Sequence, residues 1–460
     1  MKRLFERKGY GRPRNGWNSK LLFLCTLLAS LIILSIIETG IGGNGSIFFV
    51  SSYAQKKQIT LKALLVEPKD RWDSLIPAAL LRLRAAHPDL DIKINYTVLP
   101  YDAARGQLLR AIANQTAVDL MSVDEIWLGD FAQRGYLVDL TDRTVNWGKS
   151  LDWYQVNWDG GAYNHRIYGI WAWTDVRSIW YWKDLLNKAG VDPNSLKTWD
   201  GYISSAKKLD DALNGEGIKG TFVYNTTYSQ DLWYPYLWML GGDILKLKTG
   251  HPTKGTYWFP AFNSSAGVRA MEFIKNQSGI KTAGGNVEKD FASKKYAFML
   301  AGSWLPGEFS PTIKQNFEQQ IGMIPMFPVP NRNTQNTTMM GGWELSVPET
   351  SKNKDLAWEL ITIMLKPEVL APVLAKFGYL PTQVPIGEGP YSADLRKSIP
   401  YYDELVSMIP TGHARPNIPE YPLIANEIND AINKVYLGAE QPKQALDEAA
   451  AKSAKALGWP

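Results

Sequence analysis

The sequence contains little cysteine and little histidine. Its 460 residues include one cysteine and four histidines, and the histidines stand far apart at His87, His165, His251 and His413. One cysteine excludes a disulfide framework and a cysteine-based zinc site. Isolated histidines argue against a histidine-rich metal site. We therefore expect neither a metal nor a cofactor.

The common catalytic motifs are also missing. The chain has no HExxH, no GxSxG and no GxxxxGK[ST], and its four Ser-x-x-Lys matches stand alone. The remaining catalytic candidates are carboxylates: Glu67, Asp124, Glu125, Asp175 and Glu344. Two carboxyl groups ~5–10 Å apart across a sugar would suit a glycosidase. The same groups would serve equally well as acceptors for sugar hydroxyls, so both uses stay open.

An excess of positive charge is missing from most of the chain. The formal net charge is +5, but residues 1–20 alone hold seven basic residues and one acidic residue. From Gln55 onward, 43 basic residues face 43 acidic ones. Binding to nucleic acid requires a surplus of positive charge near the phosphates. We expect no nucleic-acid partner.

A charge-free apolar run follows the basic N-terminus. Residues 21–37 (LLFLCTLLASLIILSII) form a run of 17 residues, longer than the ~7–15 of a usual signal peptide and close to the ~17–25 of a spanning helix. Small residues at Ser52 and Ala54 precede Gln55. Residues 1–54 are thus expected to be a signal peptide, with cleavage after Ala54 favoured, or a retained membrane anchor. Either one places the rest of the chain outside the cell.

Strand and helix patterns alternate after this segment. Residues 59–66, 91–98 and 118–123 have strand patterns, while residues 72–83 and 103–113 have helical spacing. This β-α-β-α-β order predicts an α/β fold with a parallel sheet and helices on both faces. Ligands bind such sheets at the loops after the carboxyl ends of strands. Those loops are expected at residues 67–70 and 124–127.

Tryptophan is abundant, with 18 in the chain and seven of them between residues 147 and 182. Its broad apolar face and single N–H suit sugars, which present flat C–H faces edged by hydroxyls. Core packing is the alternative, and we expect it for half or more of them. Trp180 and Trp182 fit a strand buried on both sides. Trp171 and Trp173, close to Asp175, are better candidates for a ligand-facing surface.

Several blocks, taken in order, resemble a known family. They are DEIWLGDFAQRGYLVDLTD at 124–142, IYGIWAWTDVRSIWYWKDLLNKAGVD at 167–192, FASKKYAFMLAGSWL at 291–305 and GGWELSVP at 341–348. Their order and spacing resemble the extracellular solute-binding proteins of ABC importers, in the carbohydrate-binding family that includes maltose- and trehalose-binding proteins. The resemblance covers residues 58–460. The chain departs from the pattern at Trp171, where members often have proline.

The resemblance implies a two-lobed periplasmic-binding-protein-like α/β fold, each lobe a sheet flanked by helices, with a ligand cleft between the lobes. Lobe 1 would comprise residues 58–174 plus 328–382, and lobe 2 residues 175–327 plus 383–460. The chain would first cross between the lobes near residues 173–176 and again near residues 325–330.

The resemblance also implies a function. The protein would be a monomer and not an enzyme, and would carry a carbohydrate to the transmembrane subunits of an ABC permease. The residues expected to bind the ligand are Glu67, Asp124, Trp127, Trp171, Trp173, Asp175, Tyr228, Trp233, Trp304, Trp343 and Arg415. Two alternatives stay open: a carbohydrate-active hydrolase that uses the cleft carboxylates, and a surface structural protein.

Overall fold

The computed structural model describes residues 39–41, 47–49, 56–66, 68–222, 229–280, 287–331, 334 and 336–460. The chain divides into two compact units, Met1–Lys57 and Gln58–Pro460. In the first unit, β1 (Thr39–Ile41) pairs antiparallel with β2 (Ile47–Phe49). The apolar run at 21–37 and the site candidates Glu67 and Tyr228 lie outside the described residues. Within those residues, none of the helices combines the length and apolarity needed to cross a bilayer.

The second unit begins with the expected alternation of strands and helices. β3 (Lys57–Val66), α2 (Lys69–Ala86), β4 (Leu90–Leu99), α3 (Tyr101–Ala113) and β5 (Leu120–Asp124) follow one another. β3 pairs parallel with β5, so the carboxyl ends of both strands meet at one edge of the sheet. The α/β fold predicted from the sequence is therefore confirmed.

The sheet is mixed rather than parallel, which corrects the prediction from the first elements. The described residues give it ten strands, with the order β4-β3-β5-β14-β8-β12-β9 along its main path. β14 (Thr338–Ser346) lies antiparallel between β5 and β8 (Ile170–Trp182). The first five elements could not reveal this, because β14 comes from more than 200 residues later in the chain.

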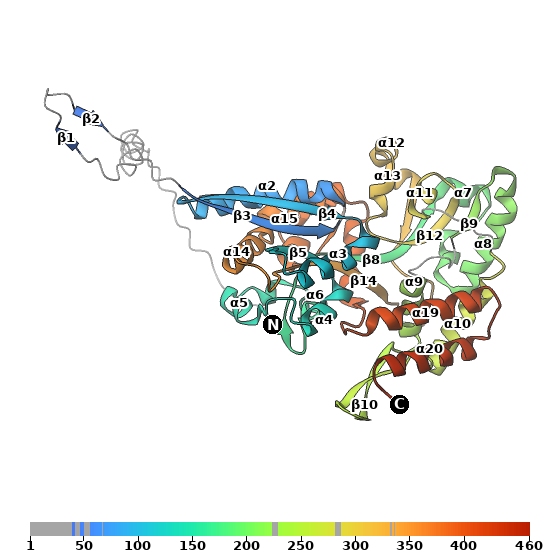
Figure 1. Cartoon of the computed structure of the whole chain (residues 1–460). Helices are drawn as coiled ribbons and strands as arrows, with labels where there is room; N and C mark the ends of the chain where they lie inside the picture. The colour runs from blue at the N-terminus through green and yellow to red at the C-terminus, as the bar shows by residue number, and fades with distance from the viewer. Residues whose placement is uncertain are drawn as a thin grey trace, which may run out of the picture. The chain divides into compact units, whose positions relative to one another are not determined.

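The long strand β8 joins the two halves of this sheet (Figure 1). Its residues 170–176 pair with β14, and its residues 177–181 pair with β12 (Tyr296–Gly302). Thr338 bonds to β8 where this strand changes its partner from β14 to β12. Its hydroxyl accepts from the Arg177 N–H and donates to the Arg177 carbonyl, both at 2.9 Å. This point adjoins the first crossing expected at 173–176. The exact residue ranges of the two lobes stay a prediction.

Helices cover both halves of the sheet. On the side of β3 and β4, α2 packs with α14 (Lys354–Met364) and α15 (Pro367–Phe377). On the side of β12, α10 (Ser265–Asn276) packs with α9 (Ser229–Met239), α19 (Tyr421–Tyr436) and α20 (Pro442–Ala456). α8 (Trp199–Leu213) begins after Thr198, whose hydroxyl accepts from the Gly201 N–H, as an N-cap should.

Further elements complete the second unit. The strands are β6 (Ala162–Tyr163), β7 (Arg166–Ile167), β9 (Lys219–Thr221), β10 (Leu245–His251), β11 (Gly255–Pro260), β13 (Ile321–Ile324), β15 (Leu380–Pro381) and β16 (Gly412–His413). The helices are α4 (Glu125–Gln133), α5 (Thr141–Trp147), α6 (Gln155–Gly160), α7 (Lys183–Lys188), α11 (Val287–Ala292), α12 (Pro311–Gln315), α13 (Phe317–Gln320), α16 (Val384–Gly387), α17 (Ser392–Ser398) and α18 (Tyr402–Ser407). The largest core cluster includes Trp180 and Trp182, as expected for a strand buried on both faces.

Candidate functional site

An aromatic wall stands where β5 ends and α4 begins. The rings of Tyr101, Trp127 and Trp343 lie 5.6–6.1 Å apart, with tilted or edge-to-face contacts. Asp124 caps α4 by accepting from the Ile126 N–H, and it also accepts from the Tyr101 hydroxyl at 2.7 Å. Asp124 faces Trp343 in the register between β5 and β14. Three predicted site residues, Asp124, Trp127 and Trp343, are thus neighbours.

A buried arginine lies next to this wall. Arg415 is 9% exposed, and its guanidinium contacts three carboxylates. It donates to Glu125 at 2.8 Å and to Asp231 at 3.0 Å, and it lies 3.4 Å from Asp124. These acids come from the β5–α4 corner and from α9, so one side chain connects the two halves of the sheet.

Burial and neighbouring charges shift the pKa values of this cluster. Desolvation raises the pKa of Glu125 well above its ordinary value; the charge of Arg415 opposes that rise, and Asp124 adds to it. Burial alone would lower the pKa of Arg415, but Asp231, Glu125 and Asp124 keep it above its ordinary value. Arg415 therefore remains a cation at neutral pH.

A second ion pair borders the cluster. Arg177, just past the point where β8 changes partners, pairs with Asp175. Its guanidinium carbon lies 4.7 Å from the centre of the Trp304 ring, which follows β12. Burial lowers the pKa of Arg177 to about 10, and the charges of Asp231, Arg415, Glu125 and Asp124 also act on it.

Gly341 lies next to both ion-pair groups. It faces Asp175 in the register between β14 and β8. A Cβ atom at this position would lie 3.2 Å from Oδ2 of Asp175 and 3.4 Å from Nη2 of Arg415. A side chain at this position would therefore crowd both Asp175 and Arg415.

Two buried carboxylate oxygens of the acids around Arg415 have no hydrogen-bond partner within the described part of the chain. They are Oε2 of Glu125 and Oδ1 of Asp231. A buried polar group without a partner costs about 1–3 kcal/mol. Hydroxyl groups of a ligand would donate to both of these oxygens.

These features belong to a known family of binding proteins. Residues 65–371, more than half of the chain, match the family described as "Bacterial extracellular solute-binding protein". The chain belongs to this family. The resemblance inferred from the sequence blocks is confirmed, and so is the general function of a solute-binding protein.

Relatives and solved structures agree with this assignment. A Brucella abortus protein named as a binding protein is 26% identical over 79% of this chain and 85% of its own length. The arabinooligosaccharide-binding protein of Bacillus subtilis is 25% identical over 60% of this chain and 62% of its own. The solute-binding protein of Thermotoga lettingae, solved with alpha-D-tagatose, has a TM-score of 0.71 at 23% identity and covers 87% of this chain and 100% of its own. That last likeness establishes the periplasmic-binding-protein-like fold.

Besides Trp127, which is 4% exposed, three more of the predicted site tryptophans lie in the core of this solute-binding protein. Trp171 and Trp173 are 1% exposed and Trp233 is fully buried. The Trp171 N–H already donates to Glu344. Trp173 packs against Trp72 at 5.3 Å and stacks on Tyr379 at 5.7 Å. Contact between a ligand and these three rings stays a prediction, as do the roles of Glu67 and Tyr228.

Sequence reasoning missed four residues that the fold brings to the site: Arg71, Tyr101, Arg177 and Asp231. The guanidinium carbon of Arg71 lies 4.4 Å from the Trp173 ring and 5.8 Å from the Trp343 ring. Arg71 comes shortly after β3, and Tyr101 comes shortly after β4. Asp124 was predicted as a site residue because it likewise stands at the end of a strand. No such signal marked Asp231, because α9 reaches the site only through tertiary packing.

Glu344 gives a testable pH dependence. It is fully buried on β14, and desolvation raises its pKa well above the ordinary value. The folded state therefore binds a proton that the unfolded state releases once the pH exceeds the ordinary carboxyl range, so stability falls as the pH rises. Glu344→Gln keeps the shape and removes the titration. We expect the variant to exceed the parent in free energy of unfolding at pH 8 and to gain less at pH 4, as measured by urea unfolding.

The matched control for this prediction is Glu349→Gln. Glu349 lies in the turn that follows β14, is exposed and pairs with Lys354. It should change stability by less than about 1 kcal/mol. An equal effect of Glu344→Gln at pH 4 and pH 8 would contradict the buried-acid interpretation.

Proposed function

We propose that the protein is the substrate-binding component of an ABC importer, which captures a mono- or oligosaccharide outside the cell and delivers it to the permease. One observation carries this proposal. Partly exposed aromatic rings stand directly beside a buried arginine–carboxylate cluster that has unpartnered polar atoms.

The chemistry of a sugar fits both parts of this site. Trp343 and Trp304, which are partly exposed, offer ring faces for the C–H surface of a pyranose or furanose ring, and Trp127 packs against Trp343. Glu125, Asp231 and Arg415 offer charge-assisted hydrogen bonds to hydroxyl groups, about twice as strong as neutral ones. An analogue that lacks one hydroxyl would leave a buried charge unpaired and bind poorly.

Further support comes from what relatives are named for or hold. The Bacillus subtilis relative is named for arabino-oligosaccharide binding, and the Thermotoga lettingae structure holds tagatose. Ligand capture would draw the two lobes together, because only the closed arrangement lets both contact the sugar. Delivery would then follow from contact of the closed form with the permease's transmembrane subunits.

The remaining parts of the proposal concern what the protein does not do. We infer that it is not an enzyme, binds no nucleic acid and acts as a monomer. Of the candidate carboxylates that the structure describes, Asp124 and Glu125 contact Arg415, Asp175 pairs with Arg177, and Glu344 is buried. This arrangement supports binding over a two-carboxylate hydrolysis. The basic N-terminal segment would export or anchor the chain.

A thermal-shift panel tests the proposal. The purified full-length protein is heated with arabino-oligosaccharides, maltose, D-tagatose, ribitol, amino acids and short peptides. A ligand at ~100 times its dissociation constant adds about 2.7 kcal/mol to the free energy of unfolding. We expect a rise in melting temperature with at least one carbohydrate. No rise with any carbohydrate would contradict the proposal, and turnover of one would favour a hydrolase.

A further inference from the structure

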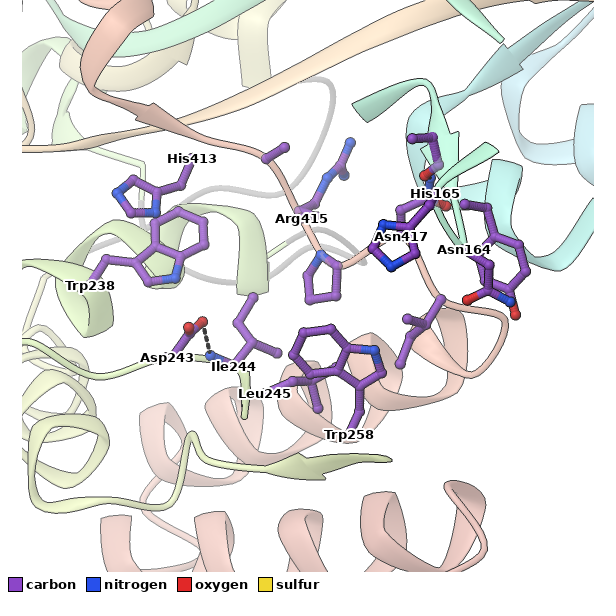
Figure 2. Close-up of a pocket in the computed structure, with 15 residues that line it drawn as sticks. Asn164, His165, Trp238, Asp243, Ile244, Leu245, Trp258, His413, Arg415 and Asn417 are labelled. Atoms are coloured by element: carbon purple, nitrogen blue, oxygen red, sulfur yellow. Dashed lines mark hydrogen bonds between the residues drawn. The ribbon is translucent and has the colours of Figure 1, made fainter. Parts of the chain in front are cut away.

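A pocket of about 470 Å³ has Arg415 among its lining residues (Figure 2). The turn between β6 and β7, the end of α9, the β10–β11 hairpin and residues 413–418 surround it. A volume of this size falls within the ~300–1,000 Å³ of small-molecule sites. Its lining includes none of Asp124, Trp127, Trp304 and Trp343, so it is separate from the site described above.

Two tryptophans form facing walls of this pocket (Figure 2). Trp238 at the end of α9 stacks on His413 with ring centres 4.8 Å apart and planes 19° apart. That contact covers one face of Trp238. Trp258, from β11, stands across the pocket, and both indoles are only partly buried. The walls therefore offer apolar ring faces to an occupant.

Polar groups sit around these walls in fixed positions. Asn164 and His165 form the two-residue turn between β6 and β7, with φ values of 48° and 63°. Positive φ at both positions is typical of a type I′ turn, whose twist matches that of the flanking strands. This backbone conformation sets the direction of both side chains. Asp243 accepts from the N–H of Ile244 through Oδ1 at 2.7 Å. The pocket thus combines hydrogen-bond donors and acceptors around its aromatic walls.

The charges of the lining favour a neutral occupant. Apart from histidines, Arg415 is the cationic side chain among the described lining residues, and its guanidinium already contacts Glu125, Asp231 and Asp124. An anion would meet the Asp243 carboxylate without a free cation to offset it. Among the described lining residues, a cation would meet one carboxylate, the exposed Asp243, and would be repelled by the like charge of Arg415.

We propose that this pocket is a second carbohydrate site that takes a single neutral sugar ring, held between Trp238 and Trp258. Its hydroxyl groups bond to Asp243 and to the side chains of the β6–β7 turn. Residues 413–418 lie between the two sites, because Arg415 lines this pocket and its guanidinium contacts the acids of the other site.

Site-resolved fluorine NMR tests the proposal. The full-length protein is labelled with 5-fluorotryptophan, and resonances are assigned by single tryptophan substitutions. D-glucose, L-arabinose and D-tagatose are titrated separately, with inorganic phosphate and tetramethylammonium as probes of the other two charge classes. We expect saturable shifts of Trp238 and Trp258 with at least one sugar. Trp358, a partly buried tryptophan on α14, should not shift.

Two variants provide the decisive comparison. Asp243 is exposed, so Asp243→Asn should leave the fold intact. It should raise about tenfold the sugar dissociation constant that is read from the Trp258 resonance. Any dissociation constant read from Trp304 should stay unchanged. Trp258→Ala should abolish the shift of Trp238.

The two sites fail in distinguishable ways. Sugar shifts at Trp304 and Trp343 without shifts at Trp238 and Trp258 would overturn the second site and leave the proposed function standing. The reverse pattern would support the second site and contradict the main one. Saturation of Trp258 by phosphate or tetramethylammonium, with no sugar response, would also overturn the second site.

Discussion

Replacing Arg415 with leucine should lower the free energy of unfolding by about 3–5 kcal/mol at pH 7. Its guanidinium sits among three buried carboxylates. Removing the cation leaves the charges of Asp124, Glu125 and Asp231 unbalanced where water cannot screen them. Urea unfolding of the variant and the parent measures the difference.

The loss should shrink in acid. Arg415 lowers the pKa of Glu125 against the effect of burial, so without Arg415 this carboxyl takes up a proton at a higher pH. Protonation removes part of the unbalanced charge, and the penalty at pH 5 should be smaller than at pH 7. Arg143→Leu is the control, because Arg143 pairs with the highly exposed Asp355 and should cost no more than about 1 kcal/mol. Equal losses for the two variants would show that the Arg415 cluster does not stabilise the fold.

Replacing Trp304 with alanine should weaken carbohydrate binding about 30-fold or more. Loss of a central aromatic contact commonly costs ~2 kcal/mol or more. The ring is partly exposed and lies against Arg177, at the border between the two ion-pair groups. At a ligand concentration of ~100 times the parent's dissociation constant, the stabilisation should fall from about 2.7 to about 0.9 kcal/mol. Isothermal titration gives the affinity and the thermal shift gives the stabilisation.

Two further variants separate stacking from general damage to the fold. Trp304→Phe keeps an aromatic face and should recover part of the affinity. Trp358→Ala removes a partly buried tryptophan from α14, where its ring contacts Trp147, and should leave the affinity unchanged. Unchanged binding by Trp304→Ala would remove Trp304 from the site.

Local patterns predicted most of the elements correctly. The helical spacing at residues 72–83 lies within α2, and the helical spacing at residues 103–113 lies within α3. Both depend on interactions within a few residues, which the sequence displays directly. The parallel arrangement was predicted only for the first strands, because nothing local to residues 59–123 indicates that β14 enters the same sheet.

The candidate site was predicted in part for the same reason. Asp124, Trp127 and Trp343 lie together, and Asp175 lies near Trp304 through Arg177. Arg177 pairs with Asp175, and Asp231 pairs with Arg415. No pattern in the sequence indicated that either partner would lie at the site. Trp171 and Trp173 illustrate the opposite case, since tryptophan suits a ligand face and a core equally and only packing distinguishes the two.

The sequence by itself determined the division of charge, the class of fold and the family. These follow from composition, from spacing along one strand or helix, and from the order of blocks, all of which are one-dimensional. Tertiary structure alone decided which charges meet. Arg415 acquires its three carboxylates from residues 184 to 291 positions away, and the second pocket arises only where four separate segments converge. Burial and electrostatic energy depend on distance in space, which residue order does not specify.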